Sequence, residues 1–109
     1  MSESEGSRNG SRQKKQSLFL AIVIRGVNTL EIIGHAQERM AERGVTQDDV
    51  IQTLLKPDEE RPLADQPGRW EAFRNKTAKL KVKVVFEPLP DRVRVITAIM
   101  IKRRIVERE

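Results

Sequence analysis

The sequence predicts an α+β fold in which two short helices pack on a twisted antiparallel sheet of three to four strands. The first observation behind this prediction is a run of good helix formers with capping signals over residues 34–55. The second is alternation of apolar and charged side chains over residues 79–101, which is typical of strands. The third is a length of 109 residues, which fits one domain, with a core that must be aliphatic because aromatic residues make up only 4%.

The chain divides into one predicted domain and two tails. Residues 1–16 contain no large apolar side chain after Met1, so we expect a disordered basic tail. A single α+β domain is expected over residues 17–104, followed by a charged C-terminal tail over residues 105–109.

Two short strands are expected before the first helix. Leu18–Val27 is rich in β-branched residues and favours a strand, with a short helix as the alternative. Thr29–Ile33 is interpreted as a second short strand that leads into the helix.

Two helices follow, joined by a tight connection. The first is expected over Gly34–Arg43, and Gly44 stands where a left-handed residue usually ends a helix. The second is expected over Thr46–Leu55. Thr46 with Asp49 three residues later forms a sequence typical of a capping box.

The rest of the domain is predicted to be a polar loop and three strands. Residues 58–68 are interpreted as the loop, and the strands are expected over Arg69–Arg74, Lys79–Phe86 and Arg92–Ile101. Pairing Val84 with Val93 in the last hairpin would keep the apolar faces together. The same register would bring the lysines of one strand near the arginines of the next.

Positive charge is concentrated in the last third of the chain. Residues 69–109 hold twelve basic and five acidic side chains, whereas residues 34–68 hold four basic and eight acidic ones. A one-sided basic surface attracts polyanions such as RNA. The alternative is a solvated face that only keeps the protein soluble.

Several classes of site are excluded by composition. The chain has no cysteine and one histidine, so disulfide frameworks, thiolate zinc sites and histidine metal sites are not expected. We therefore expect no metal and no cofactor, and the absence of cysteine fits the cytoplasm. The longest apolar run, Leu18–Ile24, is far shorter than the ~20 residues of a membrane span.

One motif resembles a known bacterial family. It comprises His35-Ala36, Arg39-Met40, Arg43-Gly44-Val45 and Asp49-Val50, then Pro57, Arg69 and Val95-Ile96-Thr97-Ala98. Over residues 34–101 the chain resembles the family called domain of unknown function 4258. The resemblance implies kinship with the RelE-like and barnase-like small metal-independent ribonucleases, many of which are toxins paired with an antitoxin protein.

Four residues are the candidates for catalysis on RNA. His35 is the natural proton carrier near neutral pH, and Arg39 lies one helical turn away, where its planar guanidinium suits phosphate. Arg69 matches an arginine of the family's pattern, and Thr97 interrupts an apolar strand face. The alternatives are a histidine that caps or packs the helix end, an ion pair of Arg39 with Glu38 or Glu42, and a threonine that satisfies a carbonyl.

Further cations are predicted to bind the RNA backbone. They are Arg43, Lys79, Lys81, Lys83, Arg92 and Arg94. The functional hypotheses are a metal-independent endoribonuclease of the RelE-like toxin type, a non-catalytic module that binds nucleic acid or protein, and a purely structural domain. RNA, an antitoxin protein and a second copy of the chain are the expected partners.

Overall fold

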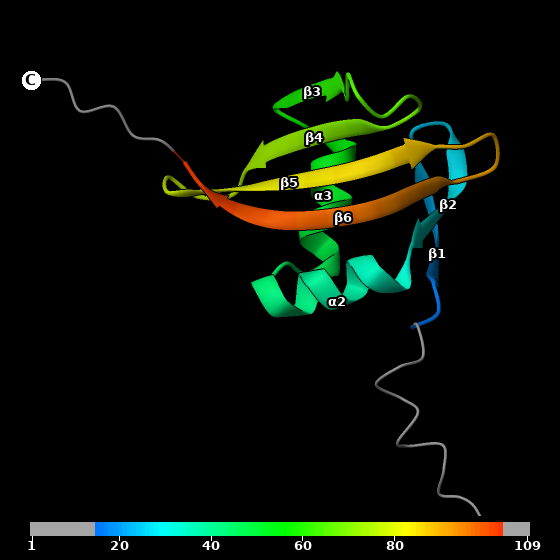
Figure 1. Cartoon of the computed structure of the whole chain (residues 1–109), viewed down its shortest axis with the longest axis horizontal. Coiled ribbons are helices and arrows are strands. Elements are labelled where there is room, and N and C mark those ends of the chain that lie inside the picture. Colours follow the sequence, from blue (N-terminus) through cyan, green and yellow to red (C-terminus); the bar gives the residue numbers. More distant parts are fainter. Residues whose placement is uncertain (1–14, 104–109) are drawn as a thin grey trace, which may run out of the picture.

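The computed structural model describes residues 15–103, which form a six-stranded mixed sheet with two helices packed on one face (Figure 1). The strands lie in the order β1-β2-β6-β5-β4-β3. The predicted tails over residues 1–16 and 105–109 lie outside the described residues, apart from residues 15 and 16. The elements are β1 (Leu18–Ile24), β2 (Val27–Ile32), α2 (Gly34–Arg43), α3 (Gln47–Leu55), β3 (Glu59–Pro62), β4 (Trp70–Asn75), β5 (Leu80–Pro88) and β6 (Val93–Lys102).

The α+β class is confirmed, but the predicted sheet of three to four antiparallel strands is wrong. The β1–β2 hairpin joins the sheet because β2 pairs in parallel with β6, with Leu30 opposite Val93 and Ile32 opposite Val95. The predicted loop over residues 58–68 contains β3, which pairs antiparallel with β4. Both pairings join segments that are distant or highly polar, so local patterns in the sequence did not indicate them.

The two helices form where the local signals placed them. Gly44 ends α2 with φ 70°, the left-handed conformation that glycine adopts most easily. The capping box at α3 is present, because the Asp49 amide donates to Thr46 Oγ1 and the Thr46 amide donates to an Asp49 carboxylate oxygen, both over 3.0 Å. No helix among residues 15–103 is long and apolar enough to cross a membrane.

The predicted register of the β5–β6 hairpin is wrong. Val84 lies opposite Ala98, and Val93 lies opposite Pro88. The reason is that β5 continues to Pro88, and the connection is a tight turn in which the Leu89 amide donates to the Arg92 carbonyl over 2.8 Å.

A β-bulge in this hairpin changes which residues of β6 face the core. Val85 pairs with Thr97 while Phe86 pairs with Val95, so one residue, Ile96, is left without an opposite partner. Val95 and Ala98 are therefore buried in the core, and Thr97 lies on the other face of the sheet, beside Val85.

The core lies between the helices and one face of the sheet. Its side chains are aliphatic except for Phe86, as the composition predicted. Both helices pack beneath this face in Figure 1, α2 along β6 and α3 across β4 and β5. Because side chains alternate along a strand, Lys81 and Lys83 lie on the opposite face, which neither helix covers.

Candidate nucleic-acid interface

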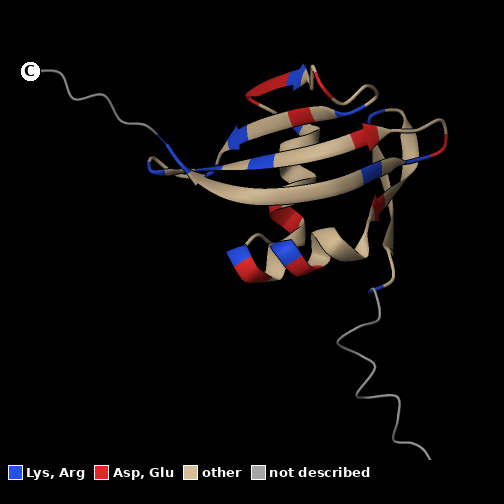
Figure 2. Cartoon of the chain, viewed as in Figure 1, with Lys and Arg blue, Asp and Glu red and all other residues tan. Residues whose placement is uncertain are grey.

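Cations gather where β4 ends, β5 begins and β6 ends. The antiparallel register produces this cluster, because Asn75 pairs with Lys81 and Leu80 pairs with Lys102. Figure 2 shows basic residues where β4 ends, β5 begins and β6 ends, with the acidic start of β3 beside the end of β4. We name the cluster the basic end; it comprises Arg74, Lys76, Lys79, Lys81, Lys102 and Arg103.

Three residues of the basic end line an open hollow of about 460 Å³. Thr77, Lys79, Leu80, Lys102 and Arg103 line it. The turn beneath the hollow is fixed, because Thr77 Oγ1 accepts from the amides of Lys79 and Leu80 over 3.1 and 3.0 Å. Arg103 NH1 donates to the Thr77 carbonyl over 2.8 Å, which orients the guanidinium. These contacts fix the backbone of the turn and the guanidinium of Arg103.

An ion pair ties this end of the sheet to α3. Lys76 Nζ lies 3.1 Å from Asp49 Oδ2, the carboxylate of the capping box. Burial raises the pKa of Asp49, but hydrogen bonds from Thr46 and Lys76 outweigh burial and hold the pKa below its usual value. Asp49 is buried and pairs with Lys76, so these two opposite charges largely offset each other and Lys76 adds little to the positive charge of the basic end.

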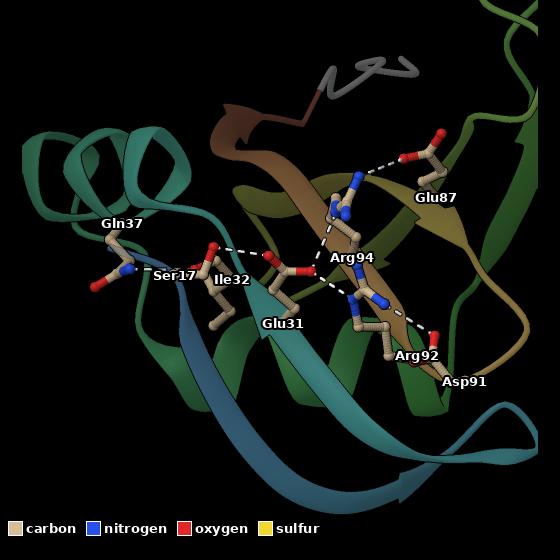
Figure 3. A network of polar contacts seen from close by, with 8 residues as sticks. All are labelled: Ser17, Glu31, Ile32, Gln37, Glu87, Asp91, Arg92 and Arg94. Carbon is tan, nitrogen blue, oxygen red and sulfur yellow. Dashed lines mark hydrogen bonds and ion pairs between the residues drawn. The ribbon is translucent and has the colours of Figure 1, made fainter. Parts of the chain in front are cut away.

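Arg92 and Arg94 lie at the opposite extremity of β6 and have acidic partners. Arg92 Nε and Arg94 Nε donate to Glu31 Oε1 over 2.6 and 3.1 Å, and Ser17 donates to the other oxygen of Glu31 (Figure 3). Burial raises the pKa of Glu31, but these three hydrogen bonds outweigh it and lower the pKa to about 2. The network therefore joins β2, and Ser17 just before β1, to β6 as a charged structural contact.

Acidic neighbours neutralise these two arginines further. Arg92 NH1 lies 2.9 Å from Asp91, and Arg94 NH1 lies 3.4 Å from Glu87.

The predicted proximity of Lys81 and Lys83 to Arg92 and Arg94 is wrong, because the true register places Lys81 opposite Ile101 and Lys83 opposite Ile99.

Lys83 and Lys81 lie over an aromatic ring on the open face of the sheet. The ammonium groups stand 6.0 and 4.9 Å from the centroid of the Phe73 ring, and the guanidinium of Arg61 stands 4.9 Å from it. The Glu71 carboxylate forms ion pairs with both neighbouring cations: Lys83 Nζ lies 3.3 Å from Oε1 and Arg61 Nε lies 2.7 Å from Oε2. Lys83 is thus paired, whereas no ion pair between described residues includes Lys79, Lys81, Lys102 or Arg103.

His35 and Arg39 contact each other on the outer side of α2. Arg39 Nε donates to His35 Nε2 over 3.2 Å, and Arg39 NH1 lies 3.7 Å from Glu42. His35 is exposed beside a hollow of about 440 Å³ at the start of the helix, which Lys15 and Ser17 also line. Arg43 is exposed in the last turn of the same helix.

The structure does not bring the four catalytic candidates together. Arg69 precedes β4 and donates to Gln66 Oε1 over 3.1 Å, and Thr97 lies on the sheet face that the helices leave open. His35 and Arg39 belong to a helix packed on the other face. The lysine-bearing surface and the imidazole are thus separated by the sheet.

The sequence analysis missed part of the basic end and the whole Glu31 network. Lys102 and Arg103 joined the basic end only through the true hairpin register. The signal that could have indicated Glu31 is a single carboxylate between the apolar residues Leu30 and Ile32 in a strand. Among residues 15–103, no group of three or more histidine, cysteine, aspartate or glutamate side chains is placed to hold a metal ion.

Comparison with known proteins identifies a family. Searches of curated proteins and of solved structures gave no match. A family model described as "Domain of unknown function (DUF4258)" matches residues 32–107, which include both helices, β3 to β6 and the basic end. The chain therefore belongs to the family of domain of unknown function DUF4258.

Proposed function

We propose that this protein binds RNA through the sugar-phosphate backbone at its basic end. The observation that carries the proposal is the contrast between two groups of cations. Arg92 and Arg94 are bound by buried or neighbouring carboxylates, whereas Lys79, Lys102 and Arg103 converge on an open hollow without an ion pair among the described residues. Converging cations of this kind attract phosphates and release bound counterions.

The hollow suits a flexible single strand. Lysine side chains can follow a backbone whose phosphates vary in position, while the oriented guanidinium of Arg103 offers a planar fork to one phosphate. Leu80 at the base of the hollow provides an apolar surface against which a base or sugar can pack. The residues that line the hollow offer charge and shape to the sugar-phosphate backbone. We therefore expect the affinity to depend little on the RNA sequence.

A pair of matched charge reversals tests this proposal. Lys102→Glu places a negative charge in the hollow, and Lys56→Glu makes the same change in net charge at the distant end of α3. Fluorescence anisotropy with a labelled single-stranded RNA should show about tenfold weaker binding for Lys102→Glu and a change of less than about threefold for Lys56→Glu. Equal affinities for both variants would refute the assignment of the basic end.

A second candidate function is metal-independent cleavage of RNA at the start of α2. The hydrogen bond from Arg39 to His35 favours it, because it places an exposed imidazole beside a guanidinium at an open hollow. Once Arg39 turns from His35 Nε2 to the phosphate, His35 would remove the proton of a ribose 2′-hydroxyl and Arg39 would stabilise the phosphate in the transition state. The 2′-oxygen would attack the phosphorus, the bond from phosphorus to the 5′-oxygen would break, and the leaving oxygen would take a proton from water or from the imidazolium. This proposal includes the RelE-like toxin role, an antitoxin protein as partner and a cytoplasmic location.

The cleavage proposal makes its own prediction. Purified protein should degrade RNA in the presence of EDTA, and His35→Ala should reduce the rate by about 10²–10⁴-fold. Asp65→Ala, a change at an exposed residue that does not line this hollow, should leave the rate unchanged. Cleavage that persists in His35→Ala, or that EDTA abolishes, would eliminate this second function while leaving the binding proposal intact.

A further inference from the structure

The first strand, β1, forms an open edge of the sheet. Its exposed side chains, Phe19, Ala21 and Val23, are all apolar, and we call them the outward row. β1 pairs only with β2 among the described strands, so the other side of β1 presents backbone N–H and C=O groups without strand partners there. No charged residue or proline occurs between Leu18 and Ile24. Phe19 and Val23 are 58% and 73% exposed. Soluble proteins usually protect such edges with charges, prolines or a covering element.

The side chains of β1 complement one another about Ala21. If two copies of the strand pair antiparallel with Ala21 opposite Ala21, Phe19 lies opposite Val23 and Leu20 lies opposite Ile22. Leu18 then lies opposite Ile24. Every pair is apolar, and pairing an aromatic with a β-branched side chain is among the favourable cross-strand combinations.

We propose that β1 pairs antiparallel with β1 of a second copy of this chain, across a twofold axis at Ala21. This isologous arrangement would join the two sheets into one. The β1–β2 bulge after Ala21 does not disturb the outward row, because exposure alternates from Leu18 to Val23 without interruption.

The charges beside the strand are compatible with self-pairing. Beyond the apolar pairs, Ser17 would lie opposite Arg25, whose guanidinium is held by Glu60 at 2.6 Å and by the Leu54 carbonyl at 3.3 Å. The basic end lies seven residues along β6 from Val95, where β2 pairs, which is roughly 23 Å at the usual rise per strand residue. Repulsion between the two basic ends is therefore largely screened at physiological salt.

Most of the hairpin lies outside the region that the family model matches. That region begins at residue 32, whereas β1 and nearly all of β2 precede it. Because the hairpin pairs with the start of β6, the edge strand on this side of the sheet is β1 and not β6. The self-pairing surface thus lies outside the matched region, and the proposal stands independently of RNA binding.

Cysteine cross-linking tests the pairing directly, since the chain has no natural cysteine. Ala21→Cys brings two thiols together at the axis, at a Cα separation of about 5 Å that a disulfide can bridge. Under mild oxidation this variant should form a covalent dimer. Asn28→Cys, an exposed position on β2, should not.

Sedimentation equilibrium gives the independent readout. The wild-type chain should sediment at twice its 12.5 kDa mass at micromolar concentration, and Val23→Lys should be monomeric with an unchanged circular dichroism spectrum. Adding Val23→Lys to Ala21→Cys should abolish the cross-link. A monomeric wild type, a dimer that survives Val23→Lys, or an edge that pairs only with a different protein would overturn the proposal.

Discussion

At the scale of single residues, similar cations differ in what surrounds them. Arg92 and Arg94 lie beside a carboxylate that is only 6% exposed, so a phosphate would have to displace Glu31 to reach them. Lys79 and Lys102 stand exposed at the rim of a hollow. The sequence analysis predicted Arg92, Arg94 and Lys79 alike as RNA-binding and did not include Lys102. A residue's type gives its charge, but it does not show which side chains lie beside it in the fold.

Glu31 gives a stability prediction with a defined pH range. Its pKa is near 2 in the folded protein and near 4.5 when unfolded, so its stabilisation is full above pH 4.5 and is lost as the pH falls toward 2. Glu31→Gln should therefore lower the free energy of unfolding by about 2–3 kcal/mol at pH 7 and by much less at pH 2. Urea denaturation at both values measures this difference.

An exposed carboxylate provides the control for this prediction. Glu38→Gln, on the solvent side of α2, should change the free energy of unfolding by less than about 0.5 kcal/mol. If Glu31→Gln costs the same at pH 2 and pH 7, the ion-pair network around Glu31 is not the source of its stabilisation.

At the scale of elements, local chemistry determined which predictions succeeded. Both helices were found because their ends carry signals within a few residues, such as Gly44 and the Thr46–Asp49 pair. The full sheet was not predicted, because the parallel pairing of β2 with β6 and the addition of β3 depend on contacts between segments that are distant in the sequence. The bulge at Ile96 then reversed the faces of the β6 residues that follow it, such as Thr97 and Ala98, a change that strict alternation of side chains cannot show.

The capping box of α3 is predicted to stabilise that helix and, through it, the basic end. Thr46→Ala removes the acceptor for the Asp49 amide, and we expect a loss of about 1 kcal/mol in the free energy of unfolding. Thr46→Ser retains the hydroxyl and should cost only a few tenths of that. Thermal or urea unfolding followed by circular dichroism compares the two, and equal losses would contradict the role of the hydroxyl.

At the scale of the whole molecule, the sheet separates the predicted functional groups. The family was recognised from a motif that extends from the first helix to the last strand, and the basic last third of the chain was evident from charge alone. Their combination into one catalytic surface was the unsupported step, since the helix that carries His35 packs on one face of the sheet and Lys81 and Lys83 lie on the other face. The candidate site that the fold offers instead is an end of the sheet, where three strand termini bring cations together.

The salt dependence of RNA binding tests this account most directly. Plotted as log of the association constant against log of salt concentration, the wild type should have a slope near −3, which corresponds to about four phosphates at roughly −0.7 each for single strands. Lys102→Glu should make the slope less steep by about 0.7 or more, and Lys56→Glu should leave it unchanged. A wild-type slope near zero, or the same slope for both variants, would contradict phosphate binding at the basic end.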